Sequence, residues 1–182
     1  MRPAPPRTGR PARVGDEGEL TVFVADEQDD HPVDADRWQA LARDALAAEG
    51  VRGDAELAVL FVDEAAMAEL NHRFMGKDGP TDVLAFPIED EEAVTGRVPD
   101  GSTAGPGRDP LGDEVPLLLG DVVICPAVAA RNAPGHAGTY DDELALLLVH
   151  GILHVLGHDH AEPAETAAMQ ARERDLLERF HR

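Results

Sequence analysis

Three histidines near the carboxyl end of the chain are spaced like the ligands of a metal ion. His150 and His154 are four residues apart, and His160 follows them. Residues four apart on an α-helix share one face, so His150 and His154 can direct two imidazoles at one point. Gly157 is the expected helix end, because glycine adopts the left-handed conformation of a C-cap without steric cost. His160 can then supply a third nitrogen, which leaves a tetrahedral zinc ion one open position for water or substrate.

The spacing H-x-x-x-H-x-x-G-x-x-H matches the zinc-binding helix of the metzincin proteases except at one position. In those enzymes a glutamate follows the first histidine and acts as the general base, whereas Gly151 stands here. A glycine can neither accept nor donate a proton. The sequence therefore favours a different reaction on a similar metal platform and disfavours a metallopeptidase.

A purely structural zinc site is the other alternative. Such sites usually have four protein ligands, and cysteine is common among them. Cys125 is the single cysteine, so a cysteine-based site is excluded. His158 is the remaining candidate for a fourth ligand, but it directly follows the expected cap and is expected to face elsewhere.

The net charge of −20 argues against a broadly basic surface for nucleic acid. The single cysteine excludes an intramolecular disulfide and fits a reducing compartment. The first 15 residues carry four arginines but no apolar core, so no signal peptide is expected. The longest apolar run, 144–149, is too short to span a bilayer. These features predict a cytoplasmic protein.

Two segments differ in composition from the rest of the chain. Residues 1–17 contain four prolines and four arginines with almost nothing to bury, which predicts a disordered tail. Residues 88–116 are rich in glycine and proline and strongly acidic, which predicts a flexible surface insertion. We expect a single domain over 18–182 that carries this insertion.

Hydrophobic periodicity and turn residues predict the elements of this domain. Strands are expected at 21–25, 56–62, 81–87 and 117–125, and helices at 34–48, 63–74, 126–136, 139–156 and 163–182. The strand at 117–125 is nearly all apolar and is expected to be central. The helix at 139–156 is apolar on almost every face, so the sheet and other helices must enclose it. The prediction is an α+β, zincin-like fold with a four-stranded mixed sheet, about five helices, and the metal site on this central buried helix and the turn after it.

Three segments resemble the signature blocks of the YbeY family of bacterial endoribonucleases. They are Leu70–Asn71 with Gly76–Pro87, then Leu119–Ile124, then His150–His160. The similarity covers roughly 22–180 apart from the insertion, and the histidine block is the most specific part. The resemblance implies that His150, His154 and His160 bind one zinc ion and act in catalysis through that ion and its water. It also implies single-strand-specific cleavage in rRNA maturation, at the 3′ end of small-subunit rRNA, and a part in ribosome quality control.

The chain departs from the family pattern at the first block. The family usually has an arginine before Gly-Lys-Asp, and here that residue is Met75. Arg73, two residues earlier, is the candidate to meet the scissile phosphate in its place, and Lys77 is a second basic residue nearby. Asp159, next to His160, is expected to hold a ligand histidine in its tautomer. No residue is predicted as the general base.

The leading hypothesis is therefore a zinc-dependent endoribonuclease whose partners are RNA and the ribosome, with ribosomal proteins or an assembly GTPase as candidate protein partners and no membrane. One alternative is a non-enzymatic ribosome-associated zinc protein, and a metallopeptidase is a less favoured one. A structural zinc predicts that His154→Ala unfolds the protein. A catalytic zinc predicts a folded protein that no longer cleaves. Loss of a peptidase activity in the same variant would support the third hypothesis.

Overall fold

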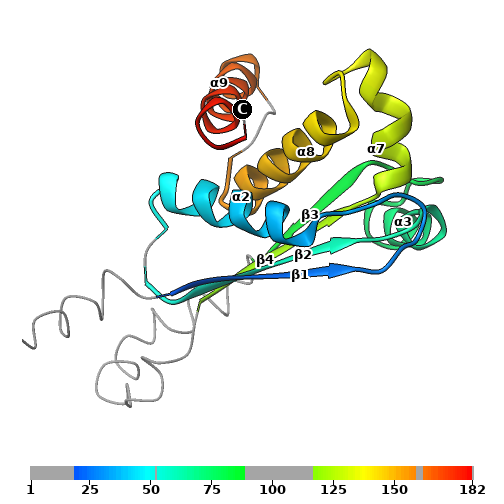
Figure 1. Cartoon of the computed structure of the whole chain (residues 1–182), viewed down its shortest axis with the longest axis horizontal. Helices are drawn as coiled ribbons and strands as arrows, with labels where there is room; N and C mark the ends of the chain where they lie inside the picture. The colour runs from blue at the N-terminus through cyan, green and yellow to red at the C-terminus, as the bar shows by residue number, and fades with distance from the viewer. Residues whose placement is uncertain (1–18, 52, 89–116, 159–161, 182) are drawn as a thin grey trace, which may run out of the picture.

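The computed structural model describes residues 19–51, 53–88, 117–158 and 162–181 (Figure 1). The predicted tail at 1–17 and nearly all of the predicted insertion at 88–116 lie outside these ranges, so both stay predictions. No helix in the described part of the chain is long and apolar enough to cross a membrane.

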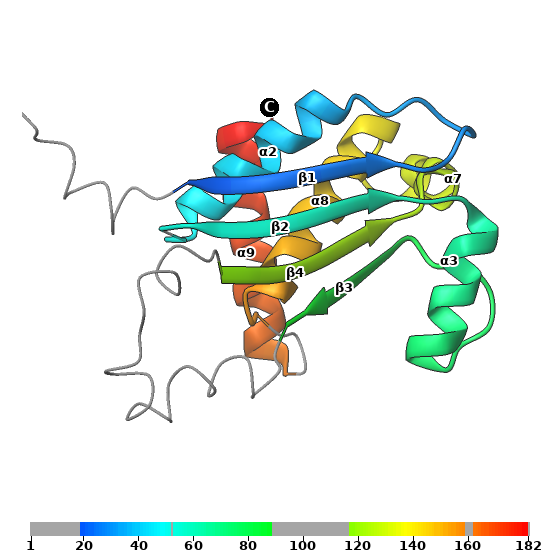
Figure 2. The same ribbon diagram turned by 90° about the horizontal axis from the view of Figure 1, so that it is seen from below.

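A four-stranded mixed sheet forms one layer of the molecule (Figure 2). Its order is β1 (Leu20–Asp26), β2 (Ala55–Phe61), β4 (Leu117–Ile124) and β3 (Val83–Pro87). The first three are parallel, and β3 pairs with β4 in the antiparallel sense at the edge of the sheet. The predicted sheet is confirmed, including the central position of β4.

Helices α2 (Ala35–Ala48) and α8 (Tyr140–Val155) cover one face of the sheet, and α9 (Pro163–Phe180) packs against both of them (Figure 1). Helix α3 (Glu64–Leu70) lies at the carboxyl ends of the parallel strands and continues into a π-helical turn, η1 (Asn71–Met75) (Figure 2). Helix α7 (Pro126–Asn132) and the 3-10 turn η2 (Ala133–Gly135) lead into α8. The described residues thus contain the five predicted helices.

Helix α8 is the centre of the hydrophobic core. Buried side chains of β2 and β4 pack against buried apolar residues of α8. The strand residues include Leu57, Val59, Phe61, Val122 and Ile124, and the helix residues include Leu144, Leu148 and Ile152. Its ends are capped by local hydrogen bonds. The Asp142 N–H donates to the Thr139 hydroxyl at 3.0 Å. Gly157 has φ of 103°, and the His158 N–H donates to the Leu153 carbonyl at 2.9 Å. The predicted beginning and end of this helix are confirmed.

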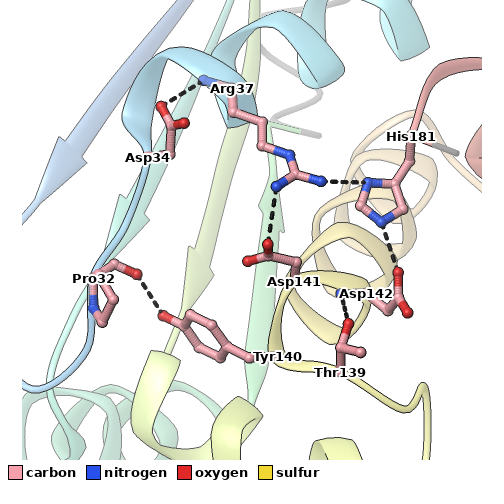
Figure 3. A network of polar contacts seen from close by, with 8 residues as sticks. All are labelled: Pro32, Asp34, Arg37, Thr139, Tyr140, Asp141, Asp142 and His181. Carbon is pink, nitrogen blue, oxygen red and sulfur yellow. Dashed lines mark hydrogen bonds and ion pairs between the residues drawn. The ribbon is translucent and has the colours of Figure 1, made fainter.

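A network of polar contacts ties the first turn of α8 to α2 and to the end of α9 (Figure 3). Arg37 of α2 donates to the Asp141 carboxylate at 3.0 Å. His181 has a nearly buried side chain and lies 2.9 Å from an Asp142 oxygen and 3.4 Å from Arg37. The Tyr140 hydroxyl donates to the Pro32 carbonyl at 2.9 Å. These contacts fix the amino end of α8 against its neighbours.

Tyr140 is the single tyrosine, so its ionisation can be followed by ultraviolet absorbance. Burial, reinforced by Asp141 and Asp26, raises the pKa of Tyr140 to about 12. An unfolded tyrosine ionises near ~10, so the stabilisation from this residue is complete below that pH and is lost as the pH rises through the folded-state value. We expect little phenolate absorbance at pH ~11 while circular dichroism shows a folded chain, and no signal in Tyr140→Phe. A phenolate midpoint near ~10 in folded protein contradicts this prediction.

Helix α8 approaches β4 too closely for a side chain at position 151. A Cβ atom on Gly151 would lie 2.6 Å from Cγ1 and 3.2 Å from Cγ2 of Val122. A glutamate at this position, as in the metzincins, would collide with the sheet. Packing therefore accounts for the glycine that follows the first histidine.

Replacing Gly151 by alanine tests this contact. Helix propensity alone favours alanine by about 0.8–1 kcal/mol, but overpacking costs about 1–3 kcal/mol. We expect Gly151→Ala to lower the free energy of unfolding by about 1 kcal/mol in urea titration, and to cost less in a Val122→Ala background. The matched control is Gly135→Ala, where no heavy atom lies within 4 Å of the new methyl group. A gain in stability for Gly151→Ala would show that the helix can move away.

Candidate functional site

A cavity of about 720 Å³ lies between α8, the edge strand β3 and the loop before that strand. We call it the histidine cavity, because His150 and His154 line it from α8. Asn71, Lys77 and Asp82 line it from the opposite side. Helix α8 packs against β3, and residues of both elements line the cavity.

The rings of His150 and His154 lie next to each other, with centroids 4.7 Å apart and planes at 81°. His160, the predicted third ligand, lies outside the described residues. Within the described ranges no group of three His, Cys, Asp or Glu side chains is close enough to hold a metal ion. The ligand set therefore stays a prediction, and the structure supplies the two members on α8.

A buried carboxylate from α9 holds the first of these histidines. Oε2 of Glu173 lies 2.5 Å from Nδ1 of His150, and Glu173 is only 8% exposed. A carboxylate accepts the Nδ1 proton and fixes the ring and its tautomer, so a metal would bind through Nε2. Carboxylates commonly hold metal-binding histidines in this way. His150 and His154 therefore fit a zinc ion.

Glu173 is not among the residues that the sequence predicts for the site; the sequence favours Asp159 for the orienting function, and Asp159 lies outside the described residues. The signal was present, since Glu173 is an acidic residue on the helical face that buries Met169, Leu176 and Leu177. A charged side chain on such a face needs a partner.

His158, which the sequence predicts to face elsewhere, borders the same cavity as His150 and His154 and contacts Glu49. Its Nε2 is 3.4 Å from an oxygen of Glu49. Glu49 also accepts a hydrogen bond from Arg172 at 2.6 Å. His158 therefore links the end of α8 to α2 and α9.

The loop opposite the histidines is shaped by η1. Gly76 ends this turn with φ of 69°, and the buried Asn71 side chain donates to the Gly79 carbonyl at 2.9 Å. Lys77 then borders the cavity. Arg73 and Lys77 are both exposed, but Arg73 is not among the residues that line the cavity, and its guanidinium lies 5.4 Å from the centre of the Phe74 ring. Within the described part of the chain, Lys77 is the one lysine or arginine that lines the cavity, and Asp82 is the one carboxylate.

A second cavity, of about 360 Å³, lies next to the first and shares the lining residues Asp82, Val83 and His150 with it. We call it the α9 cavity, because Thr166, Met169, Gln170 and Glu173 line it from that helix.

His136, on the far wall of the α9 cavity, is held by Glu143. Its Nδ1 lies 2.9 Å from both carboxylate oxygens of the fully buried Glu143. Glu143 also accepts the Ala137 N–H at 3.1 Å. Neither His136 nor Glu143 is among the functional residues predicted from the sequence.

Comparison with known proteins settles the family. The model of the family described as Endoribonuclease YbeY matches residues 23–181. The chain belongs to the YbeY family. The YbeY protein of Salinispora tropica is 52% identical over 158 residues, which cover 87% of this chain and 94% of that protein. The YbeY protein of Thermobifida fusca is 44% identical over 163 residues, or 90% and 96% of the two chains.

The solution structure of TM1509 from Thermotoga maritima has the same fold. Its TM-score is 0.53 at 24% sequence identity, over 87% of this chain and 88% of that chain. YbeY membership confirms the resemblance predicted from the three signature blocks and the prediction of a nuclease. In this member of the family, the paired histidines, one lysine and one carboxylate face a common cavity.

Proposed function

We propose that the chain is a zinc-dependent, single-strand-specific endoribonuclease that matures rRNA, at the 3′ end of the small-subunit RNA, and takes part in ribosome quality control. The observation that carries this proposal is the pair His150 and His154 in a YbeY-family cleft, with buried Glu173 on Nδ1 of His150. Two imidazoles, one of them held by a carboxylate, are suited to zinc.

Each residue around the cavity has an assignable function in this proposal. His150, His154 and His160 would hold the ion, which supplies a Lewis acid for water and a phosphoryl oxygen. Met75 stands where the family usually has an arginine and carries no charge, so Lys77 contacts the phosphate in its place. Asp82 is placed to accept a proton. Arg73, exposed on η1, would meet the RNA backbone outside the cavity.

The net charge of −20 means that RNA must be attracted by local contacts or delivered by other proteins. Ribosomal proteins or an assembly GTPase are therefore proposed as partners. They would bring the chain to its substrate in the cytoplasm despite the repulsion between two polyanions.

The test pairs metal analysis with RNA cleavage. Protein purified without added metal is expected to contain about one zinc ion per chain and to cut single-stranded RNA with the small-subunit 3′ sequence, but not the same sequence in a duplex. His154→Ala should stay folded and lose both zinc and cleavage. His158→Ala is the matched control, since His158 borders the cavity but pairs with Glu49.

Three results would contradict the proposal. If His154→Ala loses zinc and unfolds, the metal is structural and the protein is non-enzymatic. Cleavage of peptides that depends on His154 supports a metallopeptidase. Full RNA cleavage by metal-free protein removes the metal from the mechanism.

Glu173→Gln tests the pairing with His150 directly. The amide keeps the size of the side chain but loses the charge that fixes the histidine. We expect zinc affinity to fall by about 10–100-fold in competition with a chelator. Glu178→Gln, at an exposed position on the same helix, should leave the affinity unchanged. Equal affinities in the two variants would show that Glu173 only stabilises the packing of α9.

A further inference from the structure

The α9 cavity shares His150, Glu173 and Asp82 with the proposed metal site, but its remaining lining residues have no function in that proposal. Its apolar surface comes from Leu146, Leu147 and Met169. Thr166 and Gln170 add a hydroxyl and an amide along α9. Its volume of about 360 Å³ lies in the usual range for small-molecule sites. An apolar surface with a few polar groups is typical of pockets that bind small organic ligands.

The charged groups that line this cavity favour a neutral occupant over a phosphate. Asp82 and Glu173 line it, whereas no lysine or arginine of the described chain does so. Two carboxylates repel an anion but accept hydrogen bonds from the amino and imino groups of a nucleobase. The histidine cavity, which has Lys77, is the better place for the phosphate.

His136 adds a ring at the wall of the α9 cavity. Its side chain is 57% exposed, while Glu143 at 2.9 Å from Nδ1 holds the ring in place. A fully buried carboxylate is costly in free energy unless it is paired and hydrogen-bonded. The buried carboxylate of Glu143 pairs with the exposed His136 ring and accepts one backbone N–H. A fixed, half-exposed ring is suited to stack on a base.

We infer that the α9 cavity binds the unstacked base of a nucleotide adjacent to the scissile phosphate. This inference rests on the proposed function and deepens it. The two cavities share Asp82, Val83 and His150, so a strand with its phosphate in the histidine cavity can place a neighbouring base in the α9 cavity. Base insertion accounts for a preference for single strands, because a duplex keeps its bases stacked and paired.

The test removes the base from the RNA and closes the cavity in the protein. Single-stranded RNAs of about ten nucleotides, each with one abasic position, compete against cleavage of one reporter RNA. With wild type, an abasic site at one position beside the cut should raise the inhibition constant about 5–150-fold. Thr166→Phe, which fills the cavity, should abolish that penalty. Ala168→Phe, at an exposed position on the same helix, should keep it.

A second variant keeps the test valid if Thr166→Phe does not fold. Gln170→Ala trims an exposed side chain and should reduce the penalty at the same RNA position without changing thermal unfolding. If wild type cleaves the reporter but shows no penalty at any position, or if both variants keep the full penalty, the base site is wrong and the nuclease stands. If wild type cleaves no RNA, the proposed function itself fails, and the inference fails with it.

Discussion

The close contact between α8 and β4 is the constraint on which the rest of the site depends. At Gly151 the helix backbone lies against Val122, with no room for a Cβ. This contact allows the sheet to enclose α8 while His150 and His154 still reach the cleft beside β3. It also excludes a carboxylate directly after the first histidine. Acid–base groups must therefore come from other elements, and in our proposal Asp82, on the loop before β3, is that group.

Two buried carboxylates organise the histidines of this acidic protein. Glu173 holds His150 and Glu143 holds His136, and each carboxylate comes from a helix in the core. A buried charge is tolerated only when it is paired and hydrogen-bonded. The ring orientations therefore depend on the packing of α8 and α9, including the contacts of Arg37, Asp142 and His181 at the amino end of α8 (Figure 3). The C-terminal helix is thus part of the site as well as of the core.

Patterns of neighbouring residues in the sequence predict the helices and strands well, but they do not predict contacts between residues that are distant in the sequence. Thr139 and Gly157 marked the ends of α8 because caps depend on adjacent residues. The pairing of Glu173 with His150 joins residues 23 apart through the packing of α9, which no periodicity reveals. At η1 a π-helical turn replaces the end of the expected α-helix; Lys77, which follows this turn, lines the cavity, whereas Arg73, which lies within it, does not. The position of His160 stays a prediction.

An RNA-cleaving protein with a net charge of −20 cannot rely on a long-range field to capture its substrate. Salt screens charges beyond about 8–10 Å at physiological ionic strength, so contacts within the cleft must provide the attraction. Lys77 provides one positive charge beside the paired histidines, and the α9 cavity provides an apolar surface for a base. In our proposal the phosphate is held by the metal site and Lys77, and the base by van der Waals contact and hydrogen bonds. Affinity then depends on the shape of an unpaired nucleotide, which a duplex does not present, and a uniformly basic surface is unnecessary.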